Sequence, residues 1–299
     1  MLFELATHDV TGTIAQLFIY PVKSCAGVEL REAVLLAAGL EHDRQWMVID
    51  AQGGFVTQRQ WPRMALVRPQ LTSTELILHA PGIAPLHLPL TLPTQPAKVQ
   101  VQVWDDVLSA FDMGDAAAQW FSAFLEPAAN TQNSQKFRLV RFDPAQKRLS
   151  SMAWTAGVEV PNRFSDGFPV LVLGTASLAA LNHKLLKAGQ TPVSIERFRP
   201  NIVLDGLDEH DEDRIPRLHI ATAQGAVLLQ FVKPCPRCPI PNIDPTTALS
   251  TPEVGDMLQS YRQDPRVNGA VSFGMNAMVV NGAGAVLQAG QTVAGDIAF

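Results

Sequence analysis

The chain has 299 residues, of which 47% are hydrophobic and 17% charged, and its formal net charge is −5. This length suits one large or two medium domains, and the charge argues against a nucleic-acid binder that works through a basic face. No apolar run approaches the roughly 18–20 residues that cross a bilayer, and residues 1–9 do not resemble a signal peptide. We therefore expect a cytoplasmic protein with neither a membrane nor a nucleic acid as partner.

The first 110 or so residues favour short strands separated by turns. A hairpin is expected around the turn at residues 51–54, with residues 55–60 as its second arm, and residues 99–104 alternate with a period of two. Near-regular spacing of such runs is typical of a barrel or sandwich. The predicted strands of this half are 12–20, 46–50, 55–60, 66–68, 76–79, 86–90 and 99–104.

The rest of the chain mixes helices with further strands, so the fold class is mainly β (α+β). Asp115 is expected to cap a helix over 115–125 that buries Ala116, Trp120, Phe121 and Phe124. A second helix, over 177–188, is expected to begin at Ser177 and to bury Leu178, Leu181 and Leu185. Residues 126–136 resemble a linker. The predicted strands of this half are 137–142, 202–204, 218–220, 226–232 and 278–280.

Two of the three cysteines, Cys235 and Cys238, lie in a stretch with prolines at 234, 236, 239 and 241. Proline fixes φ and lacks a backbone donor, so the stretch predicts a stiff loop that presents a thiolate in a set direction. The third cysteine is Cys25, and three cysteines do not make a disulfide framework.

Several kinds of chemistry fit a C-x-x-C loop. A zinc site needs about four Cys or His ligands, and an iron–sulfur cluster usually needs four cysteines, so the sequence disfavours both. A thioredoxin-like redox pair is disfavoured because Pro239 and Pro241 oppose a helix after Cys238. A single thiolate that binds a soft transition metal within a cofactor stays open, as does a pair of inert cysteines.

Polar groups elsewhere are suited to an anion. Lys23 and Ser24 follow a strand that stops at Pro21, and Arg44 begins another strand. Arg197 and Arg199 would share one face of an extended chain, where one of them could instead pair with Glu196 or Asp205. Residues 165–168 form a turn with free amides. Each cluster alone is equally consistent with ordinary turn or ion-pair chemistry.

Taken together, these motifs resemble the MOSC superfamily, specifically the bacterial YcbX-like proteins and the mitochondrial amidoxime reducing component. The Y-P-V-K-S-C-x-G signature stands at residues 20–27, and G-L-x-x-D-R-x-W-x-V stands at 39–48. The F-R-P-N-I-V motif occupies 198–203, the C-x-R-C motif 235–238 with D-P at 244–245, and F-G-x-N occupies 273–276. The resemblance implies an N-terminal β-barrel domain over 10–130 and a MOSC β-barrel domain with a few helices over 136–299.

The resemblance also implies a molybdenum cofactor, a pyranopterin whose dithiolene sulfurs hold the metal. Cys238 would ligate molybdenum and act in catalysis, with Cys235 beside it. The residues that match cofactor-binding positions of the family are Lys23, Ser24, Arg44, Asp166, Gly167, Phe168, Arg199, Asn201, Pro236 and Asn276. Pro236 stands where eukaryotic relatives have a serine, and Gln291 stands where the family's C-terminal motif has an acid.

The activity implied is reduction of N-hydroxylated compounds: hydroxylamines, amidoximes and N-hydroxylated bases. Some YcbX-like proteins carry a C-terminal ferredoxin domain, whereas this chain has no cysteine after Cys238. We therefore expect no iron–sulfur cluster in this chain and a separate flavin or iron–sulfur protein as electron donor. Asp244 is considered as a proton donor, although a turn-forming role before Pro245 is favoured. The alternative function is a cofactor carrier, or a sulfur-transfer protein that uses a Cys238 persulfide.

Overall fold

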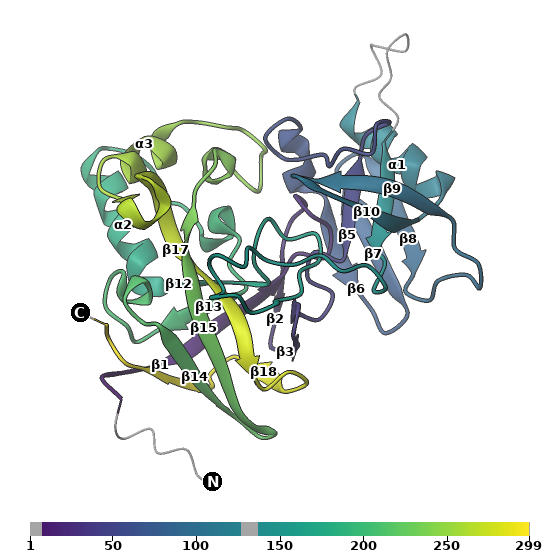
Figure 1. The fold of residues 1–299 in the computed structure, drawn as a ribbon. Helices are drawn as coiled ribbons and strands as arrows, with labels where there is room; N and C mark the ends of the chain where they lie inside the picture. The colour runs from purple at the N-terminus through teal and green to yellow at the C-terminus, as the bar shows by residue number, and fades with distance from the viewer. Residues whose placement is uncertain (1–7, 127–136, 299) are drawn as a thin grey trace.

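The structure is a computed structural model that describes residues 8–126 and 137–298. The predicted linker at 126–136 lies almost entirely outside the described residues. Strands dominate the described chain, which confirms the mainly β fold class (Figure 1). No described helix is long and apolar enough to span a bilayer.

Seven strands close into a barrel. The closing pair is β12 with β17, which aligns Leu171 with Asn276. The interior is filled by aliphatic side chains such as Ile14, Val172 and Leu229. In barrel order the strands are β12 (Val170–Gly174), β13 (Ile202–Asp205), β1 (Val10–Ile19), β19 (Thr292–Gly295), β14 (Arg217–Thr222), β15 (Gly225–Pro236) and β17 (Ala270–Asn281).

The N-terminal strand β1 lies in the same barrel as strands from the C-terminal half, because it pairs with β13 and β19. The domain boundaries expected at 130 and 136 remain a prediction, and this pairing ties the two halves together at β1. Small additions to the barrel are β2 (Val28–Leu30) on β1, β16 (Gln263–Asp264) on β17, and the sheet β18 (Val286–Gln288), β3 (Glu32–Leu36) and β4 (Gly39–Leu40).

Two antiparallel sheets and one helix form the second half of the molecule (Figure 1). Trp46, Phe121 and Phe137 pack with aliphatic side chains in their shared core. The first sheet is β5 (Trp46–Ile49), β11 (Arg138–Phe142), β10 (Asp106–Asp112) and β9 (Lys98–Val103). The second sheet is β6 (Arg68–Leu71), β7 (Glu75–Ala80) and β8 (Ile83–Pro89), and the helix is α1 (Asp115–Leu125).

Two further α-helices pack beside the barrel. They share a core with Phe198 and Phe273, whose ring centroids are 4.6 Å apart. These helices are α2 (Thr175–Lys187) and α3 (Glu253–Gln259). The short 3₁₀ segments of the described chain are Pro62–Leu66, Ile195–Phe198, Asp211–Asp213, Ile240–Asn242 and Pro265–Val267.

The predicted helix at 115–125 has the expected bounds, but its cap was wrong. Gly114 occupies the N-cap, and Asp115 lies in the first turn, where it pairs with Arg138 at 3.0 Å. Ala116 is exposed and Ala117 is buried instead, so the apolar face is rotated by one residue. Such a rotation preserves the burial of the three aromatic side chains that drive the packing.

The predicted cap of the second helix was also wrong. Ser177 lies inside α2, where its hydroxyl donates to the buried carboxyl of Glu212 at 2.7 Å. Leu181 and Leu185 are fully buried as expected, whereas Leu178 is only partly so. Tertiary pairing with Glu212 therefore takes the hydroxyl that would otherwise cap the helix.

Two predicted extended segments take other conformations. Only Phe55 and Val56 pair with β5, and the chain then turns at Thr57, whose carbonyl accepts from Trp61 at 2.9 Å. Residues 195–198 form a 3₁₀ turn and Arg199 is left-handed at φ 59°. The alternation argument for Arg197 and Arg199 therefore fails, because these residues are not extended.

Gly39 offers a test of how β4 is held against the barrel. A Cβ at Gly39, which has a φ of 95°, would lie 2.3 Å from the carbonyl oxygen of Pro169, which directly precedes β12. We expect Gly39→Ala to lower the free energy of unfolding by about 3 kcal/mol, measured by urea denaturation, since backbone strain and a backbone clash add.

Gly82→Ala is the matched control. Gly82 also has a positive φ, 77°, but no atom lies within 4 Å of a Cβ there. This variant should lose only about 1 kcal/mol, the strain of a left-handed alanine. Equal losses for the two variants would show that the approach of Gly39 to Pro169 does not constrain the fold.

Candidate functional site

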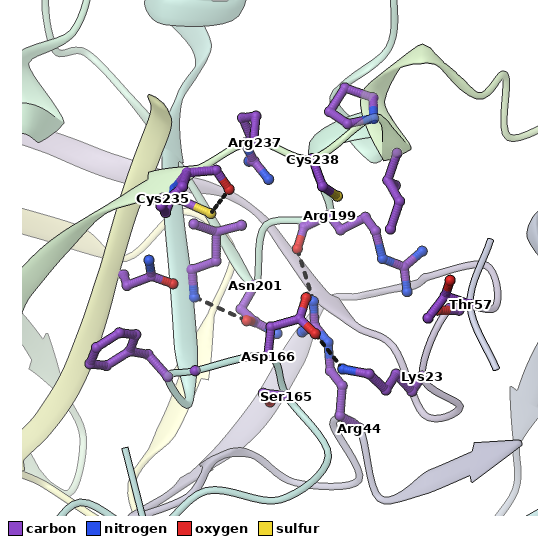
Figure 2. Close-up of a pocket in the computed structure, with 18 of the residues that line it drawn as sticks. Lys23, Arg44, Thr57, Ser165, Asp166, Arg199, Asn201, Cys235, Arg237 and Cys238 are labelled. Carbon is purple, nitrogen blue, oxygen red and sulfur yellow. Dashed lines mark hydrogen bonds and ion pairs between the residues drawn. The ribbon is translucent and has the colours of Figure 1, made fainter. Parts of the chain in front are cut away.

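One cavity of about 600 Å³ is lined by residues from both halves of the molecule. Lys23, Arg44 and Trp104 reach it from the N-terminal half, and Cys238 and Asn276 reach it from the C-terminal half. Figure 2 shows Lys23 and Arg44 facing Asp166, with Cys238 beside Arg199. A cavity of this size, built at the meeting of two sheet systems, is a typical small-molecule site.

Every site residue predicted from the sequence lines this cavity. Their roles stay predictions, but the sequence motifs that contain them, spread over more than 250 residues of chain, meet in one place. The predicted residues found there are Lys23, Ser24, Arg44, Asp166, Gly167, Phe168, Arg199, Asn201, Pro236, Cys238 and Asn276.

Four of the lining residues have a left-handed backbone although none is glycine. The φ angles are 65° at Ser24, 45° at Arg44, 56° at Trp104 and 59° at Arg199. This conformation costs of order 1–3 kcal/mol at a bulky residue, and it persists only where the surroundings enforce it. Such strain gathers at functional sites, so its concentration here supports this cavity as one.

The buried ring of Tyr20 organises two arginines. The guanidinium carbons of Arg44 and Arg199 each lie 4.2 Å from the centroid of this ring. Arg44 also forms a two-pronged pair with Asp43 at 2.7 and 2.8 Å and donates to the Arg199 carbonyl at 3.1 Å. Arg199 donates to the Cys25 carbonyl at 2.7 Å. Stacking and backbone carbonyls thus fix both cations in place.

The Lys23 ammonium is buried and has two partners. It donates to the Phe164 carbonyl at 2.8 Å and to the Asp166 carboxylate at 2.5 Å. Burial lowers the pKa of Lys23, and Asp166 opposes that shift. Desolvation raises the pKa of Asp166, but Lys23 and Arg44 outweigh it and bring this pKa down to about 2. Both groups are therefore charged at neutral pH.

Positive charge predominates around the cavity. Seven lining residues are cationic and only Asp166 is acidic. Among the described residues, four of these cations lie beyond 4 Å of any carboxylate: Arg59, Arg199, Lys233 and Arg237. Because the chain as a whole carries −5, this local excess of positive charge is a specific feature, suited to an anionic ligand.

Strand β15 delivers the cysteine motif to the cavity. Cys235 lies within the strand, and Cys238 follows in the turn, where the Arg237 amide donates to the Val271 carbonyl at 2.8 Å. The Arg237 side chain donates to the carbonyls of Phe273 and Phe198, each at 3.0 Å. The predicted stiff loop is therefore half strand and half anchored turn, and it holds the half-buried Cys238 at the cavity.

The other two thiols differ from Cys238. Burial raises the pKa of the Cys25 thiol to about 12, and Cys25 packs in the core beside Trp46. Burial also raises the pKa of the Cys235 thiol. Within residues 8–126 and 137–298, no group of three His, Cys, Asp or Glu side chains is placed to hold a metal, so the zinc alternative finds no support.

Asn201 has a structural task as well as a place in the lining. Its side-chain oxygen accepts from the Leu171 amide, and its side-chain nitrogen donates to the Phe18 carbonyl, both at 3.1 Å. The residue is 1% exposed. Its amide therefore joins β12 to β1 and sets the position of the neighbouring Arg199.

Asp244 has the turn-forming role that the sequence favoured. Its carboxylate accepts from the amides of Thr246 and Thr247 and from Arg197 at 2.9 Å. The Thr246 hydroxyl bond, these amides and Arg197 together lower the pKa of Asp244. Asp244 is also the partner of Arg197, in place of the Glu196 or Asp205 that were considered.

Sequence reasoning did not select several lining residues. Thr57 and Arg59 were placed on a hairpin arm, and Trp104 was placed at the end of a strand. A Thr-x-Arg pair after an aromatic was the available signal for the first two. Lys233 and Arg237 belong to the cysteine motif itself, where their charge was visible but given no role.

Comparisons with known proteins agree with this picture. Residues 11–128 match the MOSC N-terminal beta barrel domain, and residues 159–296 match the MOSC domain. Human mitochondrial amidoxime-reducing component 1 is 40% identical over 85% of this chain and 73% of its own. Mitochondrial amidoxime reducing component 2 of Rattus norvegicus is 35% identical over 86% of this chain and 74% of its own.

Among solved structures, the YUAD protein of Bacillus subtilis covers 95% of this chain and 94% of its own, with 12% identity and a TM-score of 0.38, which is too low to support an argument. The two domain matches and the identity to the amidoxime-reducing components are decisive by themselves. The chain belongs to the family of MOSC-domain proteins that includes the mitochondrial amidoxime-reducing components.

Proposed function

We propose that this protein reduces N-hydroxylated compounds with a molybdenum cofactor and takes its electrons from a separate flavin or iron–sulfur protein. The observation that carries the proposal is the convergence of one half-buried thiol, Cys238, with a strongly cationic cavity wall. The names of the relatives, which are amidoxime-reducing components, support the choice of substrate class.

The residues of the cavity fit the two ends of such a cofactor. A thiolate is a suitable ligand for a soft transition metal, and Cys238 is the thiol whose loop is anchored at the cavity. A phosphate needs fixed cations and N–H donors. Lys23, Arg44 and Arg199 are held in place by carbonyls, carboxylates and the Tyr20 ring, so binding an anion would require little rearrangement.

Each residue then has a defined task. Cys238 would hold the metal, and Arg44 and Arg199 would bind the anionic group, with Lys23 and Ser24 beside them. Asp166 would keep Lys23 oriented through its 2.5 Å contact, and Asn201 would keep Arg199 in register with β12. When bound, the cofactor supplies two-electron oxygen-atom chemistry, which no side chain in the cavity provides alone.

Cys238→Ala tests the metal assignment. We expect wild-type protein from a host that makes the cofactor to contain about one molybdenum per chain, and the variant to lose most of it, because a thiolate ligand is removed. Elemental analysis measures the metal, and benzamidoxime reduction with an artificial electron donor measures activity. Cys25→Ala is the control, because Cys25 lies in the core away from the cavity lining.

Full metal and full activity in Cys238→Ala would refute the assignment. A wild type that binds the cofactor but never turns over benzamidoxime, and releases cofactor stoichiometrically, would favour a carrier instead.

Arg199→Lys tests the anion site. Lysine keeps the charge but loses both the stacking on Tyr20 and the bond to the Cys25 carbonyl. We expect about tenfold weaker retention of cofactor, measured as molybdenum content after dialysis, with an unchanged melting temperature. Arg217→Lys, an exposed change on β14, should retain the wild-type content. Equal retention in both variants would remove Arg199 from the anion site.

Alkylation tests which thiol faces the cavity. At pH 7.5, iodoacetamide should label Cys238 in cofactor-free protein, whereas the raised pKa values of Cys25 and Cys235 keep those thiols protonated and slow to react. Loading with cofactor should protect Cys238. Peptide mass spectrometry gives the site of labelling. Labelling of Cys238 that is unaffected by cofactor would contradict the proposed ligation.

A further inference from the structure

Trp104 lies at the cavity in a conformation that a bulky residue rarely adopts. Strands β9 and β10 pair Val103 with Asp106, which leaves only Trp104 and Asp105 to make the turn. Trp104 takes φ 56° there, where glycine, asparagine or aspartate would be less strained. The turn by itself therefore does not favour tryptophan, and the side chain must account for its presence.

The indole ring is held on several sides. Its Nε1 donates to the Asp166 carboxylate at 3.3 Å. The Phe55 ring meets it edge-on with a centroid separation of 5.0 Å, and the Arg59 guanidinium carbon lies 5.0 Å from its centroid. These contacts come from separate segments of the chain. The ring is therefore positioned before any ligand arrives, which lowers the entropy cost of stacking on it.

Despite these contacts, Trp104 remains 43% exposed and lines the cavity. A fixed and partly exposed indole beside a cationic site offers a flat apolar surface, and flat aromatic ligands gain most from such a surface. Phe168 and Ile240 add further apolar lining to the same cavity. A small aliphatic or inorganic ligand would gain little from these groups.

We infer that Trp104 is a specificity-determining residue, which stacks on aromatic N-hydroxylated substrates and favours them over small ones. The inference rests on the proposed reductase function, and it adds the preferred substrate class and the residue that selects it. Stacking of a base on an aromatic side chain is typically lost five- to a hundredfold on replacement by alanine, so an effect of about tenfold is expected.

The experiment compares Trp104→Gly and Trp104→Phe with wild type, all loaded with cofactor. Trp104→Gly removes the ring and also relieves the left-handed strain, so this variant should melt no lower than wild type. We expect its KM for benzamidoxime to rise about tenfold while its kcat stays within twofold. The kinetics with hydroxylamine, which has no ring, should be unchanged.

Trp104→Phe should stay within about threefold of wild type, because a ring remains while the bond to Asp166 is lost. Val107→Ala is the matched control: Val107 is 65% exposed on the same hairpin, it is not one of the described residues that line the cavity, and it should change nothing. If Trp104→Phe behaves like Trp104→Gly, the bond to Asp166 matters and the stacking role is overturned. Equal loss with both substrates, or loss of molybdenum, overturns it as well.

A binding measurement separates this inference from the proposed function. Calorimetric titration of benzamidoxime into the oxidised, cofactor-loaded protein, with no electron donor, should show about tenfold weaker binding for Trp104→Gly. Wild type that binds benzamidoxime but does not reduce it would refute the reductase function and leave the stacking role standing. Absence of binding, or equal affinity in both proteins, would overturn the stacking role.

Discussion

The site depends on keeping Arg44 and Arg199 charged and close together at the edge of a protein core. Like charges this near repel each other, and only Arg44 has a carboxylate partner, Asp43. The Tyr20 ring offsets part of this cost by contact with both guanidiniums, and backbone carbonyls take their spare donors. The ring is itself fully buried, so the barrel strand that ends beside it fixes the position of both cations.

That constraint explains why backbone strain collects in this region. Ser24, Arg44 and Arg199 leave their strands or turns in left-handed conformations, which aim their side chains at one point. Their surroundings enforce this: the Arg44 amide donates to the Tyr20 carbonyl at 2.9 Å, and the Arg199 amide to the Glu196 carbonyl at 3.2 Å. The stability lost to strain is recovered in the two hydrophobic cores on either side of the cavity.

Three cysteines share one chemistry but have three environments. Cys25 contributes volume to a core, Cys235 is a strand residue whose thiol is kept protonated by burial, and Cys238 stands in an anchored turn. Proline at 236 and 239 keeps that turn from continuing as strand or helix. The contrast shows that backbone path and burial, more than the C-x-x-C spacing, decide which thiol faces the ligand.

The sequence by itself determined the family, the mainly β class and the residues of the cavity, because these depend on short motifs whose side-chain types are unusual together. It misplaced Thr57 and Arg59 on a hairpin arm and treated Arg197 and Arg199 as extended, since local propensity cannot register a turn imposed by packing. Only the tertiary structure decided that Tyr20 carries both arginines and that Trp104 lies beside Asp166. Those contacts join residues from separate strands and loops, and their geometry exists only once the barrel has closed.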